Sequence, residues 1–162
     1  MHAAPQLVLL PGLDGTGTLF GPLVQALPED IRPTVIAYPP DRVLSLPEHA
    51  DWVSNRLPGG KTVLLAESFS GLVALHLLAE APSRFRGVIF VGAFAEPPKP
   101  FLSRLAPMVP RPGSLMRTIP PFLLRQYCLG KDATVEQLNL VRRAVRSAVS
   151  YTHLTLPTIL RV

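Results

Sequence analysis

The residues best suited to chemistry form a short run around a serine, Ala66-Glu67-Ser68-Phe69-Ser70-Gly71. An apolar segment, 62–65, precedes this run, and a segment of helical character, 72–79, follows it. Small residues two before and two after a serine are the steric requirement of a nucleophile elbow, a sharp strand-to-helix turn that holds the serine in a strained backbone conformation. Glycine is the usual small residue, and here Ala66 and Ser70 take its place. The alternative is a serine that only caps a helix after a strand.

A glycine-rich segment upstream offers backbone amides to the same site. Residues 6–10 are predicted to form a short buried strand, which runs directly into Pro11-Gly12-Leu13-Asp14-Gly15-Thr16-Gly17. Such a loop can bind phosphate, but its spacing matches neither of the usual nucleotide-binding glycine patterns, and no lysine follows it. The other interpretation is that the loop supplies one N–H of an oxyanion hole, while the residue after the serine supplies the second.

The order of these parts resembles the α/β-hydrolase superfamily, specifically its compact esterase, lipase and thioesterase-like members. The superfamily places a strand, a glycine-rich loop and a second strand–helix unit before its strand–elbow–helix. The resemblance implies that Ser68 is a catalytic nucleophile that forms an acyl-enzyme with a carboxylic ester or thioester. It also implies that the N–H groups of Leu13 and Phe69 form the oxyanion hole. The more common His-Gly of the loop is Pro11-Gly12 here, a variant that also occurs in the superfamily.

Two alternatives to hydrolysis stay open. The loop together with Glu-Ser-Phe-Ser-Gly also resembles plastid-type acyltransferases, which implies acyl transfer on the same fold. A different class is a non-catalytic domain that binds an acyl ligand or a partner. For hydrolysis and for acyl transfer alike, the substrate is a small ester or thioester, free or attached to a carrier.

The elements that would hold the site alternate between strand and helix. Strands are predicted over 6–10, 34–38, 62–66 and 87–91, and helices over 18–27, 45–57 and 72–81. The second helix opens with Ser45-Leu46-Pro47-Glu48, the pattern of a capping box. Short apolar strands that alternate with helices predict an α/β fold, a parallel sheet of about four strands with helices on both faces. The resemblance implies the spatial order second, first, third, fourth, with the serine at the carboxyl edge.

The composition divides the chain into three parts. Residues 1–95 are predicted to be the N-terminal part of an α/β-hydrolase core. Residues 96–149 hold eight prolines between 97 and 121, interleaved with large apolar residues. The segment is too apolar for a disordered linker. The resemblance implies that they form a helical cap that lines an acyl pocket and keeps water out. Residues 150–162 are predicted to be a non-native tail.

Charge is unevenly distributed along the chain. Six basic and nine acidic residues give 1–98 a net charge of −3, whereas nine basic and two acidic residues give 99–146 a net charge of +7. A basic cap would steer anionic substrates or an acidic carrier protein towards the site. The alternative is that the arginines lie on solvated helix faces and have no partner. Few aromatic residues accompany them and no DNA- or RNA-binding motif is present, which argues against nucleic acid.

The sequence shows no sign of export or of a cofactor. No apolar run approaches the roughly 18 residues of a membrane span, and no basic segment precedes the first apolar stretch as in a signal peptide. The single cysteine, Cys128, cannot form an internal disulfide and is more typical of a small core residue than of a reactive thiol. We therefore expect a cytoplasmic protein without a membrane span, metal or cofactor.

A serine nucleophile needs a histidine that a carboxylate orients, and in the resembled fold both follow the cap. His2 lies in the N-terminal tail, His49 is expected on a solvated helix face, and His76 lies about 12 Å along the helix from Ser68. His153 falls within 150–162, which resembles a translated sequencing adapter. We therefore expect a C-terminally truncated fragment that lacks the triad acid and histidine and is itself inactive. The alternative is that the tail is a native strand and His153 a candidate base.

Overall fold

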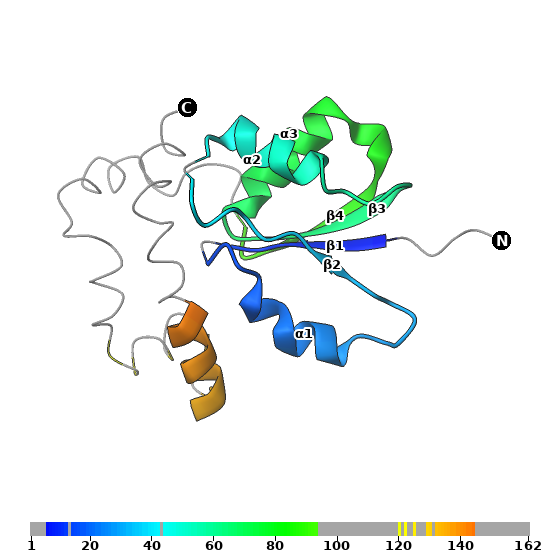
Figure 1. Ribbon diagram of the computed structural model, residues 1–162. Helices are drawn as coiled ribbons and strands as arrows, with labels where there is room; N and C mark the ends of the chain where they lie inside the picture. The colour runs from blue at the N-terminus through cyan, green and yellow to red at the C-terminus, as the bar shows by residue number, and fades with distance from the viewer. Residues whose placement is uncertain are drawn as a thin grey trace.

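A four-stranded parallel sheet organises the chain (Figure 1). The computed structural model describes residues 6–12, 14–42, 44–93, 120, 122, 125, 129, 130 and 132–144. The strands are β1 (Gln6–Leu10), β2 (Thr34–Val35), β3 (Thr62–Glu67) and β4 (Phe85–Val91). Their spatial order is β2-β1-β3-β4 and every pairing is parallel. This order confirms the predicted partial α/β-hydrolase sheet.

Helices cover both faces of the sheet (Figure 1). The first is α1 (Gly21–Ala26), which follows a 3₁₀ turn at Thr18–Phe20, so the expected helix over 18–27 is present in two pieces. On the opposite face lie α2 (Leu46–Ser54) and α3 (Ser70–Glu80). A second 3₁₀ turn, Pro82–Arg84, leads into β4.

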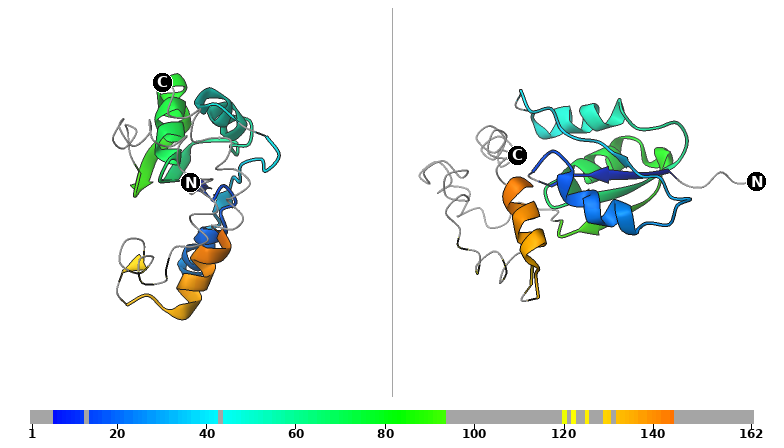
Figure 2. Two further views of the ribbon diagram at one scale, coloured as in Figure 1. Left: turned by 90° about the vertical axis from the view of Figure 1, so that its left-hand side faces the viewer. Right: turned by 60° about the horizontal axis from the view of Figure 1, so that its bottom comes forward.

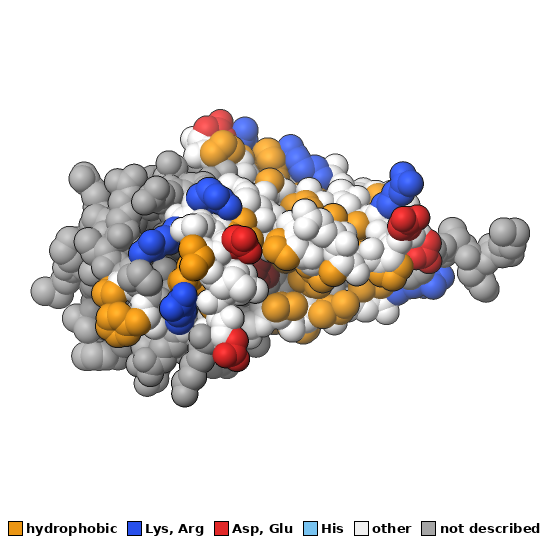
Figure 3. All heavy atoms as spheres, turned by 90° about the horizontal axis from the view of Figure 1, so that it is seen from below, with side chains coloured by type: hydrophobic (Ala, Val, Ile, Leu, Met, Phe, Trp, Pro, Cys, Tyr) orange, Lys and Arg blue, Asp and Glu red, His pale blue; other side chains and the backbone are white. Residues whose placement is uncertain are grey.

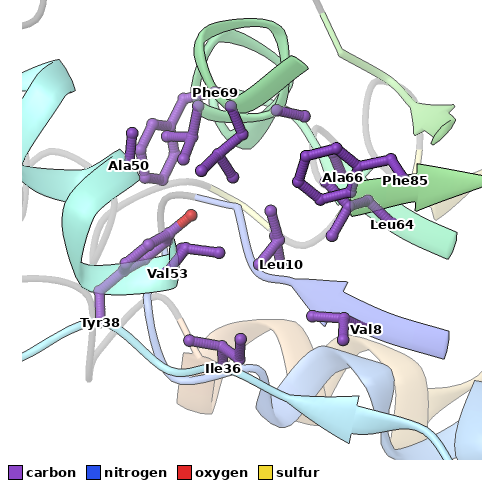
Figure 4. Packing of buried hydrophobic residues seen from close by; sticks show 13 residues of the cluster. Val8, Leu10, Ile36, Tyr38, Ala50, Val53, Leu64, Ala66, Phe69 and Phe85 are labelled. Atoms are coloured by element: carbon purple, nitrogen blue, oxygen red, sulfur yellow. The ribbon is translucent and has the colours of Figure 1, made fainter. Parts of the chain in front are cut away.

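The main core lies between the sheet and the layer of α2 and α3 (Figure 4). Successive strand residues point to opposite faces, so Val8 and Leu10 of β1 face this layer, whereas Leu9 packs with Phe20 on the side of α1. The α1 layer is thinner, because none of the residues of α1 is buried. Figure 3 shows hydrophobic side chains exposed on this side of the molecule.

The capping box before α2 is present as predicted. The Ser45 hydroxyl accepts from the Glu48 N–H at 3.4 Å, and the Glu48 carboxylate accepts from the Ser45 N–H at 2.6 Å. The helix ends at Ser54, earlier than the expected residue 57, and Asn55 forms its C-cap by donating to the Asp51 carbonyl. Local sequence therefore fixes where this helix begins more closely than where it ends.

The second strand is shorter than the expected 34–38. Ile36 N–H still bonds the Leu9 carbonyl of β1 at 3.1 Å, but two residues later Tyr38 N–H donates to Gly15 in the glycine-rich loop at 2.8 Å. The strand therefore ends early because, after the bond of Ile36 to β1, the next backbone hydrogen bond goes to the loop.

Most of the expected cap, 96–149, and the whole tail, 150–162, lie outside the described residues. Within the described part, a helical segment over 135–144 begins with a second capping box, in which Gln137 N–H bonds Thr134 Oγ1 at 3.2 Å and Thr134 N–H bonds Gln137 Oε1 at 2.9 Å. Figure 2 shows this segment near α1, past one end of the sheet. Cys128, His2 and His153 also lie outside the described residues. No helix in the described ranges is long and apolar enough to cross a membrane.

Candidate active site

Ser68 lies at a sharp turn between β3, which ends at Glu67, and α3, which begins at Ser70. Its φ of 55° is the only positive φ of a non-glycine residue among those described. For a residue with a Cβ, this conformation costs about 1–2 kcal/mol. Hydrogen bonds hold it on both sides: Ser68 N–H donates to Val91 at the end of β4, and its carbonyl accepts from Gly71, each at 3.0 Å. The turn therefore has the strained geometry that the small-residue pattern predicts.

The neighbours of Ser68 fill the positions that the motif requires. Ala66 and Ser70 are fully buried, so larger side chains would have no space there. Phe69 is the N-cap of α3, and the amides at a helix N-terminus have no acceptor within the helix and carry positive partial charge. Leu13, the other expected oxyanion donor, lies outside the described residues.

The glycine-rich loop is tied together by its own hydrogen bonds. Gly15 N–H donates to the Gly12 carbonyl at 3.0 Å and closes a tight turn. The Asp14 carboxylate then accepts from the Thr16 hydroxyl at 2.7 Å and from Gly17 N–H at 3.1 Å. Gly17 has φ 74°, and a Cβ there would lie 2.3 Å from a Val35 methyl, so only glycine fits. The loop is thus locked to itself and to β2.

The loop lies directly against the serine turn. A Cβ added to Gly12 would be 3.3 Å from Cβ of Ser68 and 3.3 Å from both Cδ and Oε1 of Glu67. The fold brings these two motifs together because β1 and β3 are neighbours in register, with Leu10 opposite Ala66. This is the juxtaposition that an oxyanion loop and a nucleophile require.

A buried hydroxyl network beside Ser68 was not predicted. Tyr38 Oη lies 2.6 Å from Ser70 Oγ, and Ser70 Oγ donates to the Pro11 carbonyl. Burial raises the pKa of Tyr38 above its usual range, so the phenol stays protonated. The signal in the sequence was the serine at a position where glycine is usual.

Two carboxylates lie close to the turn. Burial raises the pKa of Glu67, the negative charge of Asp14 raises it further, and the backbone of Gly12 lowers it. Asp14 is buried, and its Oδ1 has no hydrogen-bond partner within the described part of the chain. No cluster of three or more His, Cys, Asp or Glu residues among those described could hold a metal ion.

The prediction that His49 lies on a solvated face was wrong. Its ring is buried because α2 packs on α3, which brings the ring centroid within 4.8 Å of Tyr38 and 5.5 Å of Phe69. Burial lowers the pKa of His49, and its Nδ1 lies 2.9 Å from the Ser45 carbonyl. His76 Nε2 lies 3.1 Å from Oε1 of Glu80, which is one turn further along α3.

A family model described as alpha/beta hydrolase fold matches residues 5–120, more than half of the chain. The chain belongs to the α/β-hydrolase fold family. Among curated proteins, none matches this α/β hydrolase in sequence.

Solved structures share the fold of this α/β hydrolase at low sequence identity. A carboxylesterase of the thaumarchaeon Nitrososphaera gargenis has a TM-score of 0.66 at 15% identity, over 96% of this chain and 65% of its own. Carboxylesterase CesB of Bacillus subtilis has a TM-score of 0.61 at 15% identity, over 98% and 57%. N-formylmaleamic acid deformylase of Pseudomonas putida has a TM-score of 0.58 at 20% identity, over 91% and 65%. The chain thus spans less than two thirds of the length of these proteins.

Proposed function

We propose that this α/β hydrolase is the nucleophile-bearing part of a serine hydrolase that acts on carboxylic esters or thioesters. The observation that carries the proposal is the strained backbone of Ser68, with φ 55°, at a strand-to-helix turn in contact with the glycine-rich loop. Strain of this kind persists only where the surroundings hold it, and it is concentrated at functional sites. A serine that merely caps a helix has no need of it, since N-cap residues adopt extended conformations.

In the proposed reaction, Ser68 Oγ attacks the acyl carbon, and the carbonyl π electrons move onto the oxygen. The N–H groups of Leu13 and Phe69 stabilise that oxyanion. A histidine takes the serine proton and returns it to the leaving alcohol or thiol, and water then releases the acid from the acyl-enzyme by the same steps. We propose that the histidine and its orienting carboxylate belong to the part of the complete protein beyond these residues, and that 96–149 caps the site.

Support for an ester or thioester substrate comes from two directions. Serine as the nucleophile suits acyl chemistry, and two of the structurally similar proteins are carboxylesterases. Acyl transfer to an acceptor alcohol is the second candidate, because the same acyl-enzyme would form and only the second step would differ. A non-catalytic acyl-binding domain would form no covalent intermediate.

The test is covalent labelling of the full-length protein with a fluorophosphonate probe. We expect one adduct, on Ser68, and none in the Ser68→Ala variant. Ser83→Ala is the matched control, because Ser83 is an exposed serine in the turn before β4 and its loss leaves labelling unchanged. Labelling that survives Ser68→Ala contradicts the assignment.

Product analysis then separates the two reactions. With a nitrophenyl ester in the presence of a long-chain alcohol, a hydrolase releases mostly free acid, whereas an acyltransferase releases mostly the new ester. No release of nitrophenol above that of Ser68→Ala would favour the binding domain.

A further inference from the structure

The serine at position 70 does more than fill a small position. Its side chain is fully buried, its hydroxyl lies 2.6 Å from Tyr38 Oη, and it hydrogen bonds the Pro11 carbonyl. These contacts join three segments that are far apart in sequence, the glycine-rich loop, the chain after β2 and the first turn of α3. A glycine at position 70 would satisfy the steric requirement of the turn but could not make any of these bonds.

The direction of the hydrogen bonds follows from the number of protons. A carbonyl can only accept, so the single proton of Ser70 goes to Pro11. The bond between Tyr38 and Ser70 must then use the phenol proton, and Ser70 Oγ accepts it. Because burial keeps the phenol protonated, this order from Tyr38 through Ser70 to Pro11 does not reverse with pH in the ordinary range.

The peptide bond between Pro11 and Gly12 is held from both of its sides. No described peptide bond is cis, so the carbonyl and the N–H of this bond point in opposite directions. Ser70 binds the carbonyl. On the other side the Glu67 carboxylate lies against Gly12, with Oε1 3.3 Å from where a Cβ of Gly12 would be, and the backbone of Gly12 lowers the pKa of that carboxylate. The two residues that hold the peptide, Glu67 and Ser70, therefore lie one position before and two positions after Ser68.

Tyr38 also reaches the far end of the loop. Its backbone N–H donates to the Gly15 carbonyl at 2.8 Å, while its hydroxyl acts on Pro11 through Ser70. Its ring is fixed by neighbours, with His49 at 4.8 Å in an edge-to-face arrangement and Phe69 at 5.4 Å. One residue thus acts on the loop at two points, on Pro11 through Ser70 and on Gly15 directly.

We propose that Ser70, Tyr38 and Glu67 are positioning residues that orient the Pro11–Gly12 peptide and so set the oxyanion loop against the serine nucleophile. The proposal rests on the proposed function of Ser68. The next amide after Gly12 is that of Leu13, so a rotation of this peptide displaces the donor directly. Displacements of about 1 Å at a catalytic group can lower the rate by about 10²-fold.

The decisive variant is Ser70→Gly, which introduces the residue that is usual at this position. If only size matters, it leaves activity unchanged; if the hydroxyl positions the loop, it lowers kcat. In the full-length protein with a nitrophenyl ester, we expect kcat to fall about 10- to 100-fold with KM nearly unchanged. Tyr38→Phe should lower kcat less, because Ser70 can still donate to Pro11. Glu67→Gln, which keeps a carbonyl oxygen towards Gly12, should retain more activity than Glu67→Leu.

Ser54→Ala is the control, since it removes a serine hydroxyl that accepts from Arg84 at 2.8 Å at the opposite edge of the sheet. Hydrogen exchange of the loop amides in the 162-residue chain provides a readout that does not need catalysis. Ser70→Gly should accelerate exchange at residues 12–17, and Ser54→Ala should not. Unchanged exchange, or a kcat within twofold of the parent, overturns the proposal. If the parent protein is not labelled at Ser68 but Ser70→Gly still accelerates exchange at residues 12–17, the proposed function fails and the positioning of the loop by Ser70 stands.

Discussion

The positive φ of Ser68 can be tested through stability, without any catalytic assay. Alanine and glycine at position 68 both remove the hydroxyl, so the difference in free energy of unfolding between these two variants reports the cost of the backbone conformation. In the left-handed region a residue with a Cβ loses about 1–2 kcal/mol relative to glycine. Glycine in turn loses about 0.4–1 kcal/mol through the greater freedom of its unfolded chain. We therefore expect Ser68→Gly to be about 1 kcal/mol more stable than Ser68→Ala.

The same pair of residues at an ordinary helical position should give the opposite sign. Ala79 is exposed in α3, and Ala79→Gly should lower stability by about 1 kcal/mol. Urea unfolding of the 162-residue chain, followed by circular dichroism, measures both differences, each equivalent to about 2–4 °C in Tm. If the glycine variant is less stable than the alanine variant at both positions, the turn at Ser68 has an ordinary backbone and the argument for a strained nucleophile fails.

Three further predictions concern the loop, a carboxylate and a helix cap. Gly12→Ala forces a Cβ into contacts of 3.3 Å with Glu67 and Ser68. It should lower kcat/KM of the full-length protein about 10- to 100-fold and lower the stability by about 1–3 kcal/mol. Unchanged kinetics would mean that the loop does not lie against the serine turn. Because the pKa of Glu67 is raised in the fold, ionisation of Glu67 opposes folding. The stability of the parent relative to Glu67→Gln should therefore fall as pH rises from below the usual glutamate range through the raised pKa. The Asp14→Asn substitution removes a negative charge that raises this pKa, so it should move the fall to lower pH. A difference in urea midpoints that does not change with pH would contradict this. Ser45→Ala should destabilise the chain by about 1 kcal/mol in the same unfolding assay, whereas Ser83→Ala should have little effect.

Features encoded by neighbouring residues could be predicted from the sequence. The capping box at Ser45 needs only residues three apart, and the turn at Ser68 needs only its small neighbours. The strand order came from a resemblance that carries the topology of the fold with it. Local patterns and a recognised arrangement of motifs were therefore sufficient for the sheet and for the position of the serine.

Features that depend on contacts across the fold could not be predicted. Ser70 bonds Tyr38 at a separation of 32 residues and Pro11 at a separation of 59. His49 was expected on a solvated helix face, but the face that it occupies packs on α3. The early end of β2 has the same cause, since the loop at Gly15 competes with β1 for the backbone of the following residues.

The bond between Tyr38 and Ser70 also has a consequence for mutagenesis. The Tyr38 hydroxyl bonds Ser70 Oγ, so the effect of removing it depends on whether position 70 carries a hydroxyl. Phenylalanine at 38 should therefore lower kcat less in a background that already has glycine at 70 than it does beside serine. Libraries that vary the two positions one at a time will therefore misjudge the activity of the combined variants.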